Sequence, residues 1–253
     1  MIEERLTPTQ IEISRWTAAE FERLVLDNDP KIAVFDCDGT LWSGDSGSGF
    51  LNWSLDKGLL SRATSDGIDT RYRAYRAGKI TEQQICGEMV QIYAGLREQE
   101  LRSAAAEFMR EFLPQRIFAE MAALTDALHQ RGVELWAVSS TNKWVVAEGA
   151  RSFGIAENHV LAAEVRVTEG VISHDIVDVP TDEAKAASLQ RVGLAHPDAV
   201  FGNSVHDLAM LEIARHAYPV NPSPALLKAA AKRGWGYFLP ASAEGLDAAV
   251  EGE

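Results

Sequence analysis

The chain has 253 residues, a formal net charge of −13, and 46% hydrophobic and 24% charged residues. This length is sufficient for one α/β core with a small second unit, and the composition is typical of soluble globular proteins. The acidic balance argues against nucleic acid and anionic membrane surfaces as partners.

Neither the cysteines nor the apolar segments indicate secretion or membrane insertion. Only two cysteines are present, Cys37 and Cys86, which is too few for a disulfide scaffold. The first residues, Met-Ile-Glu-Glu-Arg, are polar and lack the apolar segment of a signal peptide. No uninterrupted apolar stretch approaches the roughly 20 residues of a membrane-spanning helix. The sequence therefore predicts a cytoplasmic protein with no membrane partner.

The amino-terminal third predicts one buried strand flanked by helices. A capping-box pattern at Thr17–Glu20 predicts a helix start, and the apolar run at 32–35 predicts a fully buried strand. The following segment to about residue 115 has no convincing strand. Its helical patterns, punctuated by glycines, cover residues 49–57, 65–76, 82–94 and 98–112.

From about residue 116, strands alternate with helices. Helices are expected at 117–130, 144–153, 182–192, 206–214 and 224–233. Strands are expected at 133–138, 160–167, 171–177, 199–201, 217–220 and 237–239, with a hairpin at 168–170. This alternation predicts a doubly wound, Rossmann-like parallel sheet. The predicted core comprises residues 1–43 and 116–253, and residues 44–115 form a helical insertion.

Two carboxylates end the first apolar strand. Asp36 and Asp38 follow the strand directly, and Gly39 and Thr40 come next. Open α/β sheets bind ligands at the carboxyl ends of their strands. Two acids packed there repel each other, and a divalent cation compensates this repulsion most simply. The alternative is an acidic turn that only caps the strand.

This stretch resembles the first motif of the haloacid dehalogenase (HAD) superfamily, whose members are mostly magnesium-dependent phosphatases. Ser139, at the end of the strand at 133–138, matches the family's second motif, and Ser140 follows it. Lys185, in the first turn of the helix at 182–192, matches the third. A cation is mildly unfavourable in a first turn, which hints at a use elsewhere. A serine-rich turn and a solvated lysine are the alternative interpretations.

The fourth motif follows the strand at 199–201. Its sequence, Gly-Asn-Ser-Val-His-Asp, resembles the family's Gly-Asp-x-x-x-Asp signature and continues as in the phosphoserine-phosphatase-like branch. Asn203 replaces the first acid, usually a metal ligand. An amide oxygen still coordinates Mg²⁺, but the lost charge predicts weaker metal affinity with catalysis retained. His206 is either a substrate contact or an exposed histidine at a helix start.

Together the motifs imply a phosphatase that forms an aspartyl-phosphate. The resemblance assigns Asp36 as the nucleophile and Asp38 as the general acid and base. It assigns Mg²⁺ to the set Asp36, Asp38, Asn203 and Asp207. The phosphate oxygens are assigned to Gly39, Thr40, Ser139, Ser140 and Lys185.

Residues 44–115 resemble the cap that closes over the site in the same branch. Such a cap favours a small phosphorylated metabolite over a macromolecule. Where the branch has a Phe and an Arg for phosphoserine recognition, this chain has Glu82 and Met89. An aromatic residue beside an acid suits a cationic amino alcohol phosphate. The candidate substrate contacts are Trp42, Asp45, Asn142, Trp144 and His206.

Three other interpretations are compatible with parts of the sequence. A phosphotransferase or mutase of the same family keeps the same motifs. A non-catalytic phosphate-binding protein with a degenerate metal site is suggested by Asn203, although the retention of Asp36 and Asp38 argues against it. A response-regulator receiver is also phosphorylated on aspartate, but it is shorter than this chain and lacks the Asp-x-Asp-Gly-Thr motif and the helical insertion.

Overall fold

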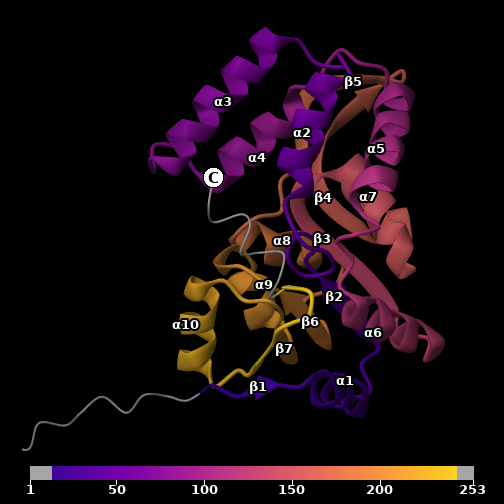
Figure 1. Cartoon of the computed structure of the whole chain (residues 1–253), viewed down its shortest axis with the longest axis vertical. Coiled ribbons are helices and arrows are strands. Elements are labelled where there is room, and N and C mark those ends of the chain that lie inside the picture. Colours follow the sequence, from indigo (N-terminus) through magenta and orange to yellow (C-terminus); the bar gives the residue numbers. More distant parts are fainter. Residues whose placement is uncertain (1–12, 244–253) are drawn as a thin grey trace, which may run out of the picture.

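The computed structural model describes residues 13–243, and its centre is a six-stranded sheet with the order β5-β4-β3-β2-β6-β7. The five strands from β4 to β7 in this order are parallel, and β5 is antiparallel to β4 at one edge. The predicted doubly wound α/β fold is therefore confirmed (Figure 1). The strands are β2 (Ile32–Phe35), β3 (Glu134–Asn142), β4 (Val160–Thr168), β5 (Val171–Asp178), β6 (Ala199–Gly202) and β7 (His216–Pro219).

Helices cover both faces of this sheet because side chains of the central strand alternate between two cores. Ala33 and Phe35 belong to one core, which also contains side chains of α1 (Ala18–Asp27), α6 (Ala119–Gln130) and α7 (Lys143–Ala150). Val34 belongs to the other core, together with side chains of α8 (Glu183–Arg191), α9 (Leu208–Ile213) and α10 (Pro224–Arg233). Burial on both faces explains why β2 is a continuous apolar run.

A short second sheet closes the end of the molecule opposite the helical insertion (Figure 1). In it, β1 (Arg15–Trp16) pairs in parallel with β8 (Tyr237–Phe238). The helix that follows β1 starts at the predicted capping box, because Thr17 Oγ1 accepts from Glu20 N at 3.3 Å and Thr17 N donates to Glu20 Oε2 at 2.8 Å.

Four helices form the insertion between β2 and α6. They are α2 (Ser46–Asp56), α3 (Arg62–Arg76), α4 (Glu82–Gln91) and α5 (Glu98–Phe112). Two of them start three residues earlier than predicted, because Asp45 and Ser61 accept backbone N–H groups as N-caps. In Figure 1 the insertion occupies one end of the molecule, above β3 and β4.

Several predicted boundaries shift where the backbone is irregular. The strand expected at 133–138 continues to Asn142, because a register shift against β4 lets it extend past Val138. The helix expected at 206–214 begins as the 3₁₀ turn η3 (Val205–Asp207) before α9. The helix expected at 144–153 ends at Ala150, and the 3₁₀ turn η1 (Arg151–Phe153) follows; a further 3₁₀ turn, η2 (Glu157–His159), precedes β4.

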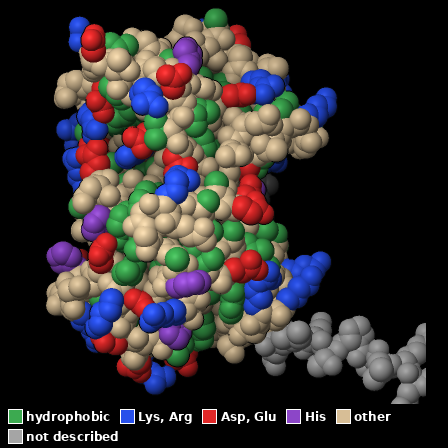
Figure 2. Space-filling model, turned by 180° about the vertical axis from the view of Figure 1, so that it is seen from behind, with side chains coloured by type: hydrophobic (Ala, Val, Ile, Leu, Met, Phe, Trp, Pro, Cys, Tyr) green, Lys and Arg blue, Asp and Glu red, His purple; other side chains and the backbone are tan. Residues whose placement is uncertain are grey.

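On the face drawn in Figure 2, acidic and basic side chains are interspersed, with apolar side chains between them. Within residues 13–243 no helix is long and apolar enough to cross a lipid bilayer.

Gly149 of α7 supports a close contact between the core and the insertion. A Cβ at this position would lie 2.7 Å from Met109 Cε and 2.9 Å from Trp42 Cη2. We expect Gly149→Ala to destabilise the protein by about 1–3 kcal/mol in a denaturant titration, because the overpacking outweighs the higher helix propensity of alanine.

Gly67 of α3 provides the control, since a Cβ there meets no atom within 4 Å. Gly67→Ala is expected to stabilise the protein by about 0.5–1 kcal/mol. Equal effects of the two substitutions would contradict the packing described for α7.

Candidate active site

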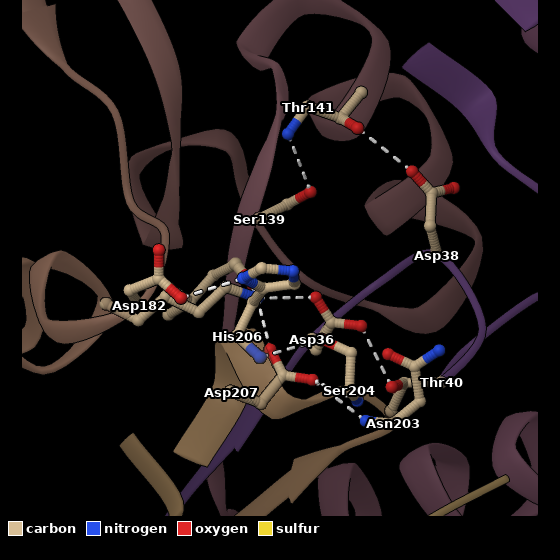
Figure 3. Close-up of polar contacts among 12 residues, drawn as sticks. Asp36, Asp38, Thr40, Ser139, Thr141, Asp182, Asn203, Ser204, His206 and Asp207 are labelled. Carbon is tan, nitrogen blue, oxygen red and sulfur yellow. Dashed lines mark hydrogen bonds and ion pairs between the residues drawn. The ribbon is translucent and has the colours of Figure 1, made fainter. Parts of the chain in front are cut away.

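Asp36 lies at the centre of a buried charge cluster at the carboxyl end of β2. Lys185 Nζ donates to Asp36 Oδ1 at 2.7 Å, to Val138 O at 3.2 Å and to Asp207 Oδ1. Thr40 Oγ1 donates to Asp36 Oδ2 at 2.9 Å (Figure 3). The lysine in the first turn of α8 thus contacts β3 at Val138, the residue that follows β2, and the 3₁₀ turn that follows β6.

The cluster carries an excess of buried negative charge. Burial raises the pKa of Asp36 to about 7, the nearby Asp207 adds to the rise, and Lys185 opposes it. Burial alone would lower the pKa of Lys185, but the carboxylates of Asp207 and Asp36 raise it overall, so the lysine is a permanent cation. One ammonium group does not compensate two buried carboxylates.

Asp38 points away from this cluster, toward the insertion. Its Oδ1 accepts from Trp42 Nε1 at 2.6 Å and Ser46 N at 3.0 Å, and its Oδ2 accepts from Ser46 Oγ at 3.0 Å and Thr141 Oγ1 at 2.9 Å. Burial, followed by repulsion from Asp45, raises the pKa of Asp38 to about 6. A carboxyl group that titrates this close to neutrality is suited to exchange protons.

The loop after β6 is held by Asp207. Its Oδ2 accepts from Asn203 N at 2.9 Å and Ser204 N at 2.8 Å, while its Oδ1 accepts from Lys185. Asp207 was expected to ligate a metal, but it is fully buried and, unlike Asp36, does not line the cavity. The structure therefore places Asp207 behind the site, where it positions Lys185 and the loop.

Gly39 permits the close approach of this loop to the first motif. Its φ is +80°, and a Cβ there would lie 1.9 Å from Asn203 Nδ2. A side chain at position 39 would be both strained and in collision. Glycine here therefore brings the Asn203 amide next to the turn that follows Asp36.

A cavity of about 550 Å³ opens beside these groups. The strand ends contribute the expected residues Asp36, Asp38, Gly39, Ser139, Ser140, Lys185 and Asn203 to its wall. The expected substrate contacts Asp45, Asn142 and His206 also line it. The His206 ring lies 2.7 Å, through Nδ1, from Asp182 Oδ1 (Figure 3).

Besides Asp207, three expected site residues lie outside the cavity wall. Trp42 is fully buried and donates to Asp38, and Trp144 is buried and donates to Glu98 Oε1 at 3.1 Å. Both tryptophans therefore belong to the packing around the site, and neither is retained as a substrate contact. Thr40 is also fully buried, and its hydroxyl is used on Asp36 instead of pointing into the cavity.

Thr141, which directly precedes the expected Asn142, lines the wall and holds Asp38. Other wall residues were not found from the sequence. Tyr72, Tyr75 and Tyr93 come from the insertion, and no motif marks them. Their positions depend on how the insertion folds over the strand ends.

The site fits a hard divalent cation of the Mg²⁺ type. Asp36 has uncompensated negative charge, and Asn203, whose side-chain amide can supply a further oxygen donor, lines the same cavity. Among residues 13–243 there is no cluster of three or more His, Cys, Asp or Glu side chains arranged to hold a metal. Such a site would therefore depend on amide and carbonyl oxygens as well as on carboxylates.

This arrangement, a buried aspartate at the end of a central parallel strand under a helical insertion, defines a hydrolase fold. A family model for haloacid dehalogenase-like hydrolases matches residues 33–212. The chain belongs to the haloacid dehalogenase-like hydrolase family, and phosphatases are prominent among its relatives.

Among the curated relatives, a histidinol-phosphatase of Neisseria meningitidis serogroup C is 24% identical, over 81% of this chain and 96% of that protein. A probable phosphatase of Mycobacterium tuberculosis is 28% identical, over 80% of this chain and 73% of that protein. The fold is similar to a protein of unknown function from Bordetella pertussis Tohama I, with a TM-score of 0.72 and 24% identity over 82% and 97% of the two chains. It also resembles a phosphoserine phosphatase in a phospho-aspartyl intermediate analogue form, with a TM-score of 0.56 and 16% identity over 83% and 93%.

The buried charge of Asp36 makes stability depend on pH. Its pKa in the folded protein, about 7, exceeds that of an unfolded aspartate, so this group stabilises the fold at low pH and the contribution is lost as pH rises through 7. In metal-free protein, Asp36→Asn should raise the free energy of unfolding by about 1–4 kcal/mol at pH 8.

The gain should shrink toward pH 5, where Asp36 of the unsubstituted protein is protonated. Urea titrations of both proteins at pH 5, 6.5 and 8 in the presence of a chelator measure it. A gain that is independent of pH, or one that grows as pH falls, would contradict the assignment.

Proposed function

We propose that this chain is a magnesium-dependent phosphatase that hydrolyses a small phosphomonoester through an aspartyl-phosphate on Asp36. One observation carries the proposal: a buried carboxylate at the end of the central strand is held by Lys185 and Thr40 on the wall of a cavity of about 550 Å³. Cavities of this size suit small ligands.

In the proposed reaction, an oxygen of Asp36 attacks phosphorus in line with the ester oxygen, which leaves. Lys185 and Thr40 hold the attacking carboxylate, and Lys185 also neutralises developing charge. Asp38 gives a proton to the leaving oxygen and then takes one from the water that hydrolyses the acyl phosphate.

The remaining groups at the strand ends serve the phosphate. Ser139 and Ser140, which line the cavity, are proposed to hold the non-bridging oxygens. The backbone N–H groups of Gly39 and Thr40 already donate to Trp42 O at 2.6 Å and to Cys37 O at 3.1 Å. Mg²⁺, held by Asp36, Asn203 and the Asp38 carbonyl, would neutralise charge on the nucleophile and the phosphoryl group.

We further propose that the molecule divides into a core, residues 1–43 and 116–253, and a cap, residues 44–115. Residues of α2, α3 and α4 line the cavity opposite the strand ends, which supports a role in enclosing the substrate. Enclosure would exclude bulk water and favour small substrates.

The family also contains enzymes that pass the phosphoryl group to another acceptor. Hydrolysis is the simpler assignment because no second acceptor site is needed, and a product analysis with an added alcohol tests it. The names of the relatives suggest a first screen of histidinol phosphate and phosphoserine, beside phosphoethanolamine and sugar phosphates.

The covalent step gives a direct test of the nucleophile. A generic aryl phosphate should be hydrolysed only when Mg²⁺ is present, and Asp36→Asn should lower kcat by about 10³-fold or more, because no other group replaces the nucleophile. Mass spectrometry of a quenched reaction should locate phosphate on the peptide that contains residue 36. Activity in the variant, or labelling elsewhere, would refute the mechanism.

The side-chain amide of Asn203 should determine the Mg²⁺ concentration that activity requires. Asn203→Asp restores a charge beside the cation, so the Mg²⁺ concentration for half-maximal activity should fall by about 3–30-fold. A magnesium titration of aryl phosphate hydrolysis measures it, with Asn221→Asp, on the neighbouring part of the wall, as a comparison. An unchanged half-saturation in Asn203→Asp would contradict Asn203 as a ligand.

A further inference from the structure

The two sides of the cavity differ in chemistry. The strand-end side contains Lys185, whose Nζ is within hydrogen-bond distance of Asp36, Asp207 and Val138 O. Apart from His206, Lys185 is the one basic side chain among the described residues of the wall. The side formed by the insertion is acidic and aromatic, with Asp45, Phe50, Tyr72, Tyr75, Glu82 and Tyr93.

Two polar atoms of the wall lack partners. Among residues 13–243, four buried side-chain atoms have no hydrogen-bond partner, and Glu82 Oε2 and Asn142 Nδ2 are the two that belong to cavity-lining residues. Asn142 is only 7% exposed, and its Oδ1 is already used to cap α7. Buried polar atoms are rarely left unpaired, so these two indicate a ligand with both a donor and an acceptor.

Glu82 lines the cavity, and its carboxylate is buried and incompletely satisfied. Its side chain is 17% exposed, and its Oε1 accepts only a weak contact from Cys86 Sγ at 3.6 Å. His206 Nε2 lies 4.0 Å from Oε2, beyond hydrogen-bond reach. Burial, and then a hydrogen bond to Glu82 and the charge of that carboxylate, raise the pKa of the Tyr75 phenol, so the Tyr75 hydroxyl lies beside Glu82 and partly satisfies it.

Asp45 is the less available of the two acids on this side. Its Oδ1 accepts from Ser48 N and its Oδ2 from Ser48 Oγ, both at 2.8 Å, because it is the N-cap of α2. Glu82 is the first residue of α4. An acid in the first turn stabilises a helix even when its side chain is exposed to solvent. Stabilisation of α4 alone therefore does not explain why Glu82 lines the cavity.

We propose that Glu82 binds a positively charged nitrogen on the leaving alcohol of the substrate, an inference that rests on the proposed phosphatase function. The rings of Tyr72 and Tyr75 pack against the same group, and the Asn142 amide donates to an acceptor elsewhere on the alcohol. A cation that leaves water is stabilised by a carboxylate and by aromatic faces. The substrate class is thus the phosphomonoester of a small amino, alkylammonium or imidazolium alcohol.

Pairs of esters that differ only in charge test this inference. Choline phosphate is compared with 3,3-dimethylbutyl phosphate, and phosphoethanolamine with propyl phosphate. The measured quantity is kcat/KM, or the inhibition constant against aryl phosphate hydrolysis where turnover is slow. The unsubstituted enzyme should prefer each cationic ester by about 10-fold or more. Phosphoethanolamine can donate a charge-assisted hydrogen bond to the carboxylate, whereas choline phosphate, which has no N–H, gains only the ion pair and the aromatic contacts.

Glu82→Gln should lower this preference toward one, mainly through KM for the cationic ester, and Glu82→Asp should retain part of it. Glu107→Gln is the matched control, because Glu107 is an exposed acid of α5 paired with exposed Lys57 and lies outside the cavity. It should keep the full preference. Thermal unfolding confirms that each variant is folded.

The outcomes separate the two proposals. Aryl phosphate hydrolysis with no preference for cationic esters, or a preference that survives in Glu82→Gln, overturns the role of Glu82 and leaves the phosphatase intact. Absence of Mg²⁺-dependent hydrolysis of every ester by the unsubstituted protein overturns the phosphatase function itself.

Discussion

The ion pairs that Lys185 makes with Asp36 and Asp207 are the constraint on which the rest of the site depends. The three side chains are almost fully buried, and removal of the lysine would leave two carboxylates unpaired in an apolar environment. The lysine also donates to the carbonyl of Val138, so one ammonium group joins β3 to the residue that follows β2 and to the turn that follows β6. This use explains a cation in the first turn of α8, where the helix dipole disfavours it.

The same cluster determines how charged side chains are distributed between the two sides of the cavity. The one lysine of the described wall lies at the strand ends and is held there by two acids. The insertion contributes acids and aromatic rings and no lysine or arginine to the described wall. A cationic leaving group would meet a complementary surface on the insertion, whereas a doubly anionic phosphate would need a divalent cation to offset the excess negative charge at the strand ends.

Much of the core could be predicted from the sequence, because its strands and strand ends are marked by patterns of only a few consecutive residues. The apolar run before Asp36 and the strand before Asn203 each end in polar residues, and neighbouring parallel strands bring those ends together. The contact of Lys185 with Asp36 spans 149 residues, so it was predictable only through the family resemblance. Trp42 was misassigned because an aromatic residue near the motif has the same sequence signal whether it faces the cavity or the core. The tyrosines of α3 were missed because their place depends on the packing of the whole insertion.

The alternation of β2 between two hydrophobic cores also limits where the Asp36 carboxylate can lie. Ala33 and Phe35 point to one layer of helices and Val34 to the other. A slip of this strand by one position would turn each of these side chains toward the wrong layer. Insertions or deletions within the strand would therefore disorganise both layers at once. The register of β2 thus fixes the position of Asp36 to a single residue.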